Sequence, residues 1–201
     1  MPRVPSDLAR RLSRGAALTI AGLLLAGGCA TTPSGVMQAT VRKATPVESR
    51  LTRDAITPLL QALEDPTVHT PGCAIGLGVA VSPRINASIA RNRKDGCPRF
   101  AIVLTEGALT RLPVGMLRAV LAHELGHLVR QHTGRNTQAQ EIAADEFATR
   151  LLKRLEPRHA DACLQLVYVF SVLAEPGNAG WFAAHPSPDR RAEAALAQCN
   201  R

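Results

Sequence analysis

The run His123–His127, which reads His-Glu-Leu-Gly-His, holds side chains whose types and spacing suit metal-dependent hydrolysis. Residues four apart lie on one face of a helix, so His123 and His127 can both direct an imidazole nitrogen at one ion. Zinc accepts such nitrogens and makes a hydroxide available at neutral pH. Glu124 would lie beside the ion, where its carboxylate can take a proton from the attacking water and pass it to the leaving amine.

Glu141 is the candidate third ligand. It follows His127 on the next expected helix, and two antiparallel helices joined by a short turn can bring it to the histidines. The resulting His₂Glu set with one open position is typical of catalytic zinc, and we expect one ion per chain. Asp145 lies one turn further along the same face, where it can hydrogen-bond a ligand imidazole. The alternative, a solvated acidic face, fits poorly with the apolar Phe147 and the alanines beside these carboxylates.

The zinc-binding run requires a helix, and the surrounding pattern predicts one. Pro113 suits the first turn of a helix, and Thr133-Gly134 ends the apolar stripe that follows it. Further helices are expected at 47–63 (bent near Pro58), 106–113, 137–155, 158–174 and 189–198.

Three apolar runs in the first half of the chain predict strands. They cover residues 74–81, 85–90 and 100–104, with a Ser-Pro turn at 82–83 between the first two. The third run is apolar enough to be a central strand. The expected fold class is therefore α+β: a mainly helical domain with a small antiparallel sheet.

The N-terminus has the pattern of a secretory signal. A charged stretch ends at Arg14, and the apolar run Ala16–Ala26 is too short for a helix to span about 30 Å of hydrocarbon. Leu25–Cys29 resembles the lipobox of bacterial lipoproteins, in which the Cys becomes the lipidated first residue, although Ala26 stands where Leu is usual. The alternative is an ordinary signal peptide that is cut near Ala30, with Cys29 incidental.

These features predict the domain organisation and the location. Residues 1–28 form the signal peptide, 29–46 a flexible tether anchored through lipid on Cys29, and 47–201 the metallopeptidase domain. Ala30 after the Cys, in place of Asp, implies retention at the outer membrane by the sorting habit of such lipoproteins. We therefore expect a lipid-anchored protein on the periplasmic side of the bacterial outer membrane.

The basic charge does not indicate a nucleic-acid partner. Of the formal charge of +8, the leader contributes four Arg against one Asp, a net +3, which leaves +5 for the rest of the chain. The densest basic cluster, Arg91–Lys94, lies in an expected turn and has no interleaved aromatic residues for stacking bases. A solvated basic surface, compatible with an anionic membrane nearby, is the better interpretation.

Four cysteines besides Cys29 suggest two disulfides in an exported domain. Three connectivities are possible. We favour Cys73–Cys97, which would clamp a hairpin, and Cys163–Cys199, which would attach the C-terminus to a helix. A cysteine-based zinc site lacks any Cys-x-x-Cys pair.

The zinc-binding run, followed by Glu141-x-x-Ala144-Asp145, resembles the gluzincin metallopeptidases of the HtpX and CAAX-prenyl-protease group. The resemblance covers about residues 70–195 and includes their late His-Pro loop, here His185–Arg191. The interval between His127 and Glu141 is shorter than is usual in that group. The stretch 141–152 also resembles ImmA/IrrE-type metallopeptidases, but those are cytoplasmic, so the leader and the His-Pro loop favour the first group.

The resemblance implies a zincin-like domain and roles for further residues. His185 would lie near the metal and steady the tetrahedral intermediate or cap an idle site; the alternative is a loop residue that makes a turn hydrogen bond. Arg190 or Arg191 would pair with Asp145 or another acid. His132 resembles a His often found just past the zinc helix. A substrate edge strand is expected at Asn86, Ala87 and Ser88, to which an extended peptide would add as a further strand.

The expected function is that of a zinc-dependent endopeptidase in envelope protein quality control. Its partners would be unfolded protein or peptide substrates, a preference that the family alone implies, and the membrane through the N-terminal lipid. The alternative is a non-catalytic or latent zinc-stabilised lipoprotein that acts as a chaperone or assembly partner. Glu124→Gln distinguishes the two, because it removes the general base and leaves the ligands in place.

Overall fold

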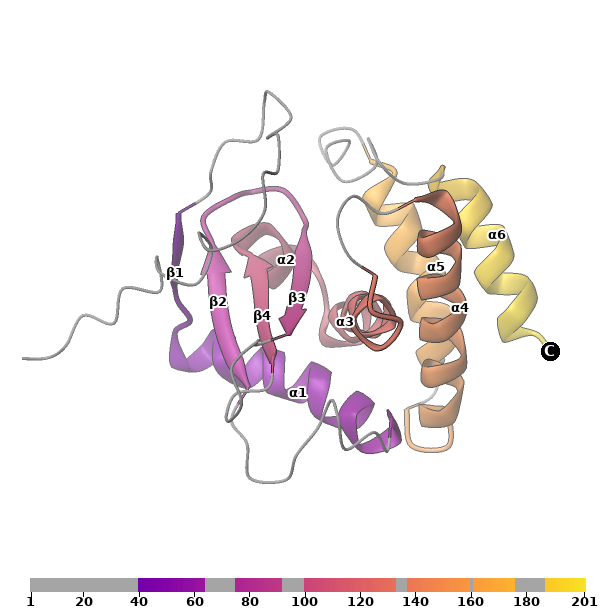
Figure 1. Cartoon of the computed structure of the whole chain (residues 1–201), viewed down its shortest axis with the longest axis horizontal. Coiled ribbons are helices and arrows are strands. Elements are labelled where there is room, and N and C mark those ends of the chain that lie inside the picture. Colours follow the sequence, from indigo (N-terminus) through magenta and orange to yellow (C-terminus); the bar gives the residue numbers. More distant parts are fainter. Residues whose placement is uncertain (1–39, 64–74, 92–99, 133–136, 160, 176–186) are drawn as a thin grey trace, which may run out of the picture. The chain divides into compact units, whose positions relative to one another are not determined.

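The computed structural model describes residues 40–63, 75–91, 100–132, 137–159, 161–175 and 187–201, all within the compact unit Ala39–Arg201 (Figure 1). Helices dominate and a small sheet occupies the first half, which confirms the predicted α+β class. The elements are, in order, β1 (Val41–Lys43), α1 (Pro46–Leu63), β2 (Gly76–Ala80), β3 (Ala87–Arg91), β4 (Phe100–Thr105), α2 (Glu106–Arg111), α3 (Val114–Val129), α4 (Gln138–Leu155), α5 (Ala162–Leu173) and α6 (Pro188–Cys199).

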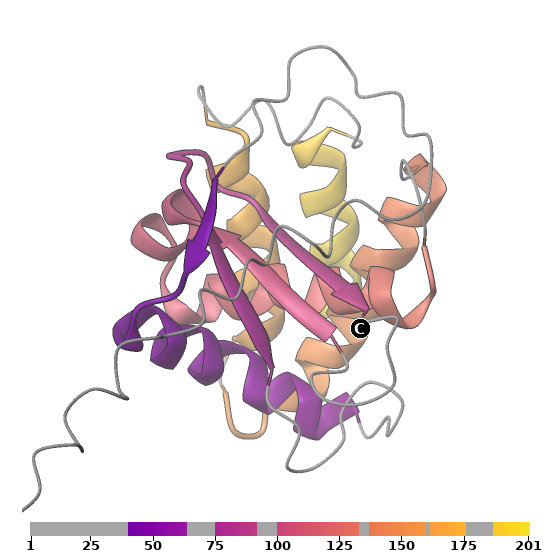
Figure 2. The ribbon, with the colours of Figure 1, turned by 60° about the vertical axis from the view of Figure 1, so that its left-hand side comes forward.

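The four strands form one mixed sheet in the order β1-β2-β4-β3 (Figures 1 and 2). β4 pairs in parallel with β2 and antiparallel with β3, and β1 is antiparallel to β2. The prediction of a wholly antiparallel sheet is therefore wrong, because β4 lies between the two strands expected as a hairpin. Phe100, Ile102 and Leu104 of β4 are buried, and a strand this apolar is best buried with a neighbour on each side.

The last part of the predicted tether is structured. β1 pairs with β2 from Val41↔Ala80 to Lys43↔Gly78, and α1 already begins at Pro46. The Arg42 guanidinium forms ion pairs with Glu48 of α1 at 2.7 Å and with Glu106 of α2 at 2.9 Å. Residues 40–46 therefore belong to the folded unit, contrary to the predicted boundary at 46.

Helix α3 lies at the centre of the helical layer. It contacts α1, α4, α5 and β3 (Figure 1). Leu117, Leu121 and Leu125 along it are fully buried. Gly126 allows α4 to approach closely, because a Cβ at this position would lie 2.9 Å from the backbone oxygen of Ala144. This close approach brings the beginning of α4 beside the second half of α3.

The C-terminal helices follow the predicted pattern. Helix α4 begins with a capping box between Thr137 and Gln140. Its bounds agree with the predicted range 137–155. Helix α5 begins at Ala162 rather than near 158, because a turn in which Asp161 has a φ of 58° precedes it. The predicted disulfide Cys163–Cys199 is present and joins α5 to the last residue of α6, with Cα atoms 5.8 Å apart.

The signal peptide, Cys29 with its lipobox, and the cysteines of the second expected disulfide, Cys73 and Cys97, lie outside the described residues. None of the described helices is long and apolar enough to cross a membrane.

Candidate active site

Two imidazoles on α3 form the first half of the site. His123 and His127 lie one helical turn apart, and their Nε2 atoms face each other at 3.0 Å. Only 1% of His123 and 9% of His127 is exposed, because α3 is enclosed by its neighbouring elements. The predicted arrangement of both side chains on one helical face is thus present.

Glu141 completes the group from the first turn of α4. Its carboxylate is fully buried, with Oε2 3.3 Å from Nε2 of His123 and Oε1 3.4 Å from Nε2 of His127. The cap at Thr137 fixes where α4 begins, and the close approach at Gly126 sets its distance from α3. Glu141 therefore lies where the sequence predicts a third ligand.

The donor set and its spacing fit a metal ion. His123, His127 and Glu141 offer ligand atoms that all lie within 4.8 Å of one another, a group that could hold a metal. Ligands placed tetrahedrally at about 2.0–2.1 Å from zinc lie about 3.3–3.4 Å apart, close to the observed 3.0, 3.3 and 3.4 Å. Although burial alone would lower the pKa of His123, hydrogen bonds to Asp145 and Glu141 raise it to about 9. The carboxylates thus favour positive charge at this point.

Asp145 orients His123 from one turn further along α4. Its Oδ1 lies 2.8 Å from Nδ1 of His123. Burial favours the neutral acid, but hydrogen bonds from His123 and Arg191 hold the pKa of this carboxyl below its usual range. An ionised Asp145 accepts the Nδ1 proton, so Nε2, which faces Glu141, is the nitrogen of His123 that is left to bind an ion.

The arginine that binds Asp145 is Arg191. Its Nε and Nη2 donate to the two oxygens of Asp145, each at 2.7 Å, and its guanidinium lies 4.4 Å from the ring centroid of Phe170. Arg191 is 3% exposed, whereas Arg190 is exposed. Of the two predicted arginines, Arg191 makes this contact and Arg190 does not, because consecutive residues of a helix point about 100° apart and α6 turns Arg191 toward α4.

Glu124 lies on the same helix as the two histidines and is only partly exposed. Burial raises the pKa of its carboxyl to about 7, and the charge of Glu141 adds to this shift. His123, Arg191 and the backbone N–H of Ile89 act in the opposite direction. A carboxyl with a pKa near neutrality can both accept and return a proton, as a general base requires.

The predicted substrate strand is the terminal strand of the sheet, and α3 packs against it. The N–H of Thr105 donates to the backbone oxygen of Asn86 at 3.1 Å. The backbone carbonyl of Asn86 therefore points toward β4. Along an antiparallel pair, the N–H and C=O groups of successive residues point alternately toward the partner strand and away from it. Those of Ser88 therefore also point toward β4, whereas those of Ala87 and Ile89 point to the other edge of β3. Of the three predicted residues, Ala87 is therefore the one whose backbone faces outward.

His132 contacts the site in a way that the sequence did not specify. Its Nδ1 lies 2.9 Å from Nδ1 of His127, and its backbone N–H donates to the oxygen of the same residue at 3.0 Å. Gln131, with a φ of 55°, turns the chain back after α3 and makes this contact possible. The feature of the sequence that points to this contact is a His five residues after His127.

His185, the other histidine predicted near the metal, lies outside the described residues.

Comparison with known proteins supports the class. Residues 108–201 match the family model described as Peptidase U49. The matched segment contains α3 to α6, and with them His123, Glu124, His127, Glu141 and Asp145. The same comparisons found no match among curated proteins or solved structures. The fold, the possible metal site and this match support a peptidase family, while the narrower resemblance to the HtpX and CAAX-prenyl-protease group stays a prediction.

Proposed function

We propose that this protein is a zinc-dependent endopeptidase that cleaves unfolded polypeptides. The observation that carries the proposal is the convergence of His123, His127 and Glu141 next to Glu124. Two imidazoles and one carboxylate are a usual ligand set for catalytic zinc. The match to a peptidase family model over this segment supports the same reaction class.

The roles of the side chains follow from their positions. His123, His127 and Glu141 would hold the ion, which when bound supplies Lewis acidity and lowers the pKa of a water molecule. Glu124 would take the proton of the attacking water and pass it to the departing amine. Asp145 and Arg191 would keep His123 in the tautomer whose Nε2 carries the lone pair.

The substrate would bind as an additional strand beside β3. The outward backbone carbonyls of Ala87 and Ile89 offer acceptors to an extended peptide, next to the helix that carries Glu124. The N–H of Ala87 already donates to Oδ1 of Asn86 at 2.8 Å, and the N–H of Ile89 hydrogen-bonds to Glu124. Main-chain pairing of this kind is independent of side-chain sequence, which suits unfolded chains as substrates.

The proposal extends to the location. The apolar run that ends at Ala26 and the small residues before Cys29 support export and lipid attachment. A protein anchored in this way would act at the periplasmic face of the outer membrane in envelope protein quality control. Growth with radiolabelled palmitate would label the wild type and leave Cys29→Ala unlabelled; equal labelling would contradict the anchor.

The test of the reaction combines zinc content with cleavage of unfolded casein by the purified full chain. We expect about one zinc per chain in the wild type and in Glu124→Gln, but cleavage only in the wild type. Glu146→Gln on α4, which is partly exposed and pairs with Arg150, is the matched control and should retain both properties. Undiminished cleavage by Glu124→Gln would refute the mechanism.

A second outcome would favour the alternative function. Zinc bound by the wild type and lost in His123→Ala, without cleavage by either protein, would indicate a non-catalytic or latent zinc-stabilised lipoprotein. Absence of zinc from a folded wild type would remove the metal site and both functions with it.

A further inference from the structure

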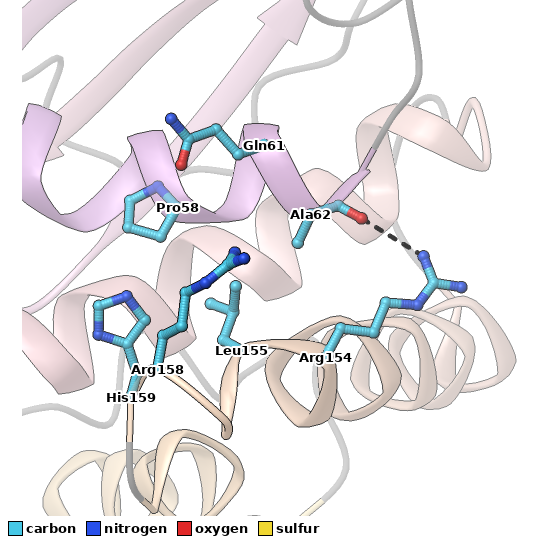
Figure 3. Close-up of a pocket in the computed structure, with 7 residues that line it drawn as sticks. All are labelled: Pro58, Gln61, Ala62, Arg154, Leu155, Arg158 and His159. Atoms are coloured by element: carbon cyan, nitrogen blue, oxygen red, sulfur yellow. Dashed lines mark hydrogen bonds between the residues drawn. The ribbon is translucent and has the colours of Figure 1, made fainter.

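A second site lies between α1 and the end of α4 (Figure 3), and none of the candidate metal ligands lines it. At 1.5 Å per residue, α4 carries the chain about 20 Å from Glu141 to Arg154. The pocket has a volume of about 440 Å³, and its lining residues are Pro58, Gln61, Ala62, Arg154, Leu155, Arg158 and His159.

The polar lining of the pocket is basic. Arg154, Arg158 and His159 contribute side chains, and the lining contains no carboxylate. Figure 3 draws one hydrogen bond in the pocket: Nη1 of Arg154 donates to the backbone oxygen of Ala62 on α1, at 3.4 Å. Within the ranges that the structure describes, no carboxylate forms an ion pair with Arg154 or Arg158. Both arginine side chains are exposed, so an anion in solution can reach their charges.

A further cation lies behind His159. Arg118 of α3 is 9% exposed; its Nη2 donates to the backbone oxygen of Asp54 at 3.3 Å, and its Nε has no hydrogen-bond partner among the described residues. Burial lowers the pKa of His159, and the charges of Arg118 and Arg158 lower it further. Burial lowers the pKa of Arg118, and the negative charge of Asp54 acts in the opposite direction. Positive potential is thus concentrated at the His159 side of the pocket.

Capping of helix ends explains only part of this arrangement. Basic residues near a helix C-terminus are stabilised by the unpaired carbonyls there, and Arg154 fits this role at the end of α1. Arg158 and His159 lie beyond the end of α4, and no side-chain hydrogen bond holds either of them among the described residues. The backbone of His159 is held by its N–H, which donates to the oxygen of Leu155 at 2.8 Å.

We propose that this pocket binds a phosphate ester. The guanidinium groups of Arg154 and Arg158 match the oxygens of a phosphate, which accepts paired N–H donors and prefers several cations to one. His159 and Gln61, which also line the pocket, carry further N–H groups. Pro58, Ala62 and Leu155 form an apolar part that suits the carbon skeleton of an ester better than a free ion. The source would be a phospholipid headgroup or a soluble phosphate ester.

The first arm of the test titrates inorganic phosphate and glycerol phosphate into the full chain by calorimetry. We expect saturable binding that weakens at least tenfold in R154Q/R158Q. The control R53Q/R150Q removes the same charge from exposed residues of α1 and α4 that do not line the pocket, and it should bind like the wild type. Equal binding by all three proteins, or no binding by the wild type, would overturn the proposal. Circular dichroism verifies that each variant is folded.

The second arm identifies the source of the phosphate. In a Cys29→Ala background, which removes the proposed lipid anchor, vesicles of phosphatidylglycerol should retain the otherwise wild-type chain and R53Q/R150Q more than R154Q/R158Q if the pocket takes a lipid headgroup. Equal retention, with the difference in glycerol phosphate binding preserved, would assign a soluble ester. Because no zinc ligand is changed, loss of the metal site would leave both arms intact, so the two proposals fail separately.

Discussion

Arg191 of α6 binds both carboxylate oxygens of Asp145 of α4, each at 2.7 Å, and Asp145 in turn contacts Nδ1 of His123. The arginine and the aspartate are separated by 46 residues in the chain. Helix α6 therefore contributes to the geometry of a site to which it supplies no ligand. Nη2 of Arg191 also lies 3.9 Å from Oε2 of Glu141. One buried guanidinium is therefore next to two carboxylates of the site, those of Asp145 and Glu141.

Replacement of Arg191 by Met should weaken zinc binding. Asp145 would remain buried without its main cation, at a cost of about 3–5 kcal/mol in the free energy of unfolding. The loss of a partner behind a ligand typically lowers metal affinity about 10–100-fold. Competition with a chelator and urea denaturation measure the two effects. Arg190→Met, on the exposed adjacent residue, is the control, and an equal loss in that variant would contradict the role of Arg191.

His132 should matter through its acceptor nitrogen. If Nε2 of His127 faces the ion, Nδ1 of His127 carries the proton. This N–H then donates a hydrogen bond to Nδ1 of His132, 2.9 Å away. Burial and the nearby charge of His127 lower the pKa of His132, which favours the neutral acceptor. His132→Phe should weaken zinc binding about tenfold, whereas His132→Asn, with an amide oxygen, should restore most of it. Equal affinity in both variants would exclude this hydrogen bond as a determinant.

Gly126→Ala should push α3 and α4 apart. The added Cβ would lie 2.9 Å from the backbone oxygen and 3.0 Å from the Cα of Ala144, and a backbone cannot move as a side-chain end does. We expect a loss of about 1–3 kcal/mol in the free energy of unfolding and weaker zinc binding. Gly115→Ala is the comparison, because there the nearest atom, at 3.1 Å, belongs to the flexible Gln165 side chain. Similar stability losses in both would argue against a special role for Gly126.

The Cys163–Cys199 disulfide should stabilise the helix that carries Arg191. It closes a segment of 36 residues and joins α5 to the end of α6. Replacement of both residues by Ala should lower the free energy of unfolding by about 2–4 kcal/mol. Zinc affinity should fall less than in Arg191→Met, since the arginine itself remains. A zinc affinity that fell as far as in Arg191→Met would show that α6 detaches without the disulfide.

The Arg42–Glu48 ion pair should give stability a dependence on acid pH. The hydrogen bond from Arg42 lowers the pKa of Glu48 from 4.5 to about 2. A depressed carboxyl pKa stabilises the fold above the unfolded value, so this contribution is complete above pH 4.5 and is lost as the pH falls toward 2. Glu48→Gln should therefore be less stable than the wild type at pH 6, and the difference should shrink below pH 4.5. Because the pair is partly exposed, high salt should reduce the difference.

Local patterns in the sequence determined most elements and the centre of the site. The spacing of His123 and His127, the apolar stripe around them and the helix punctuation by Pro113 identified α3, since these signals depend on residues within a few turns. Glu141 followed from its place in the first turn of the next helix. The pairing of Cys163 with Cys199 followed from the expected helices that carry them.

Tertiary structure decided how these elements lie against one another. The insertion of β4 between β2 and β3, and the pairing of β1 within the expected tether, depend on contacts between distant segments. The choice of Arg191 over Arg190 depends on the rotation of α6 about its axis, and the contact of His132 depends on the left-handed turn at Gln131. Local propensity does not encode these features, because their free energy comes from burial and hydrogen bonds that exist only after the helices have packed.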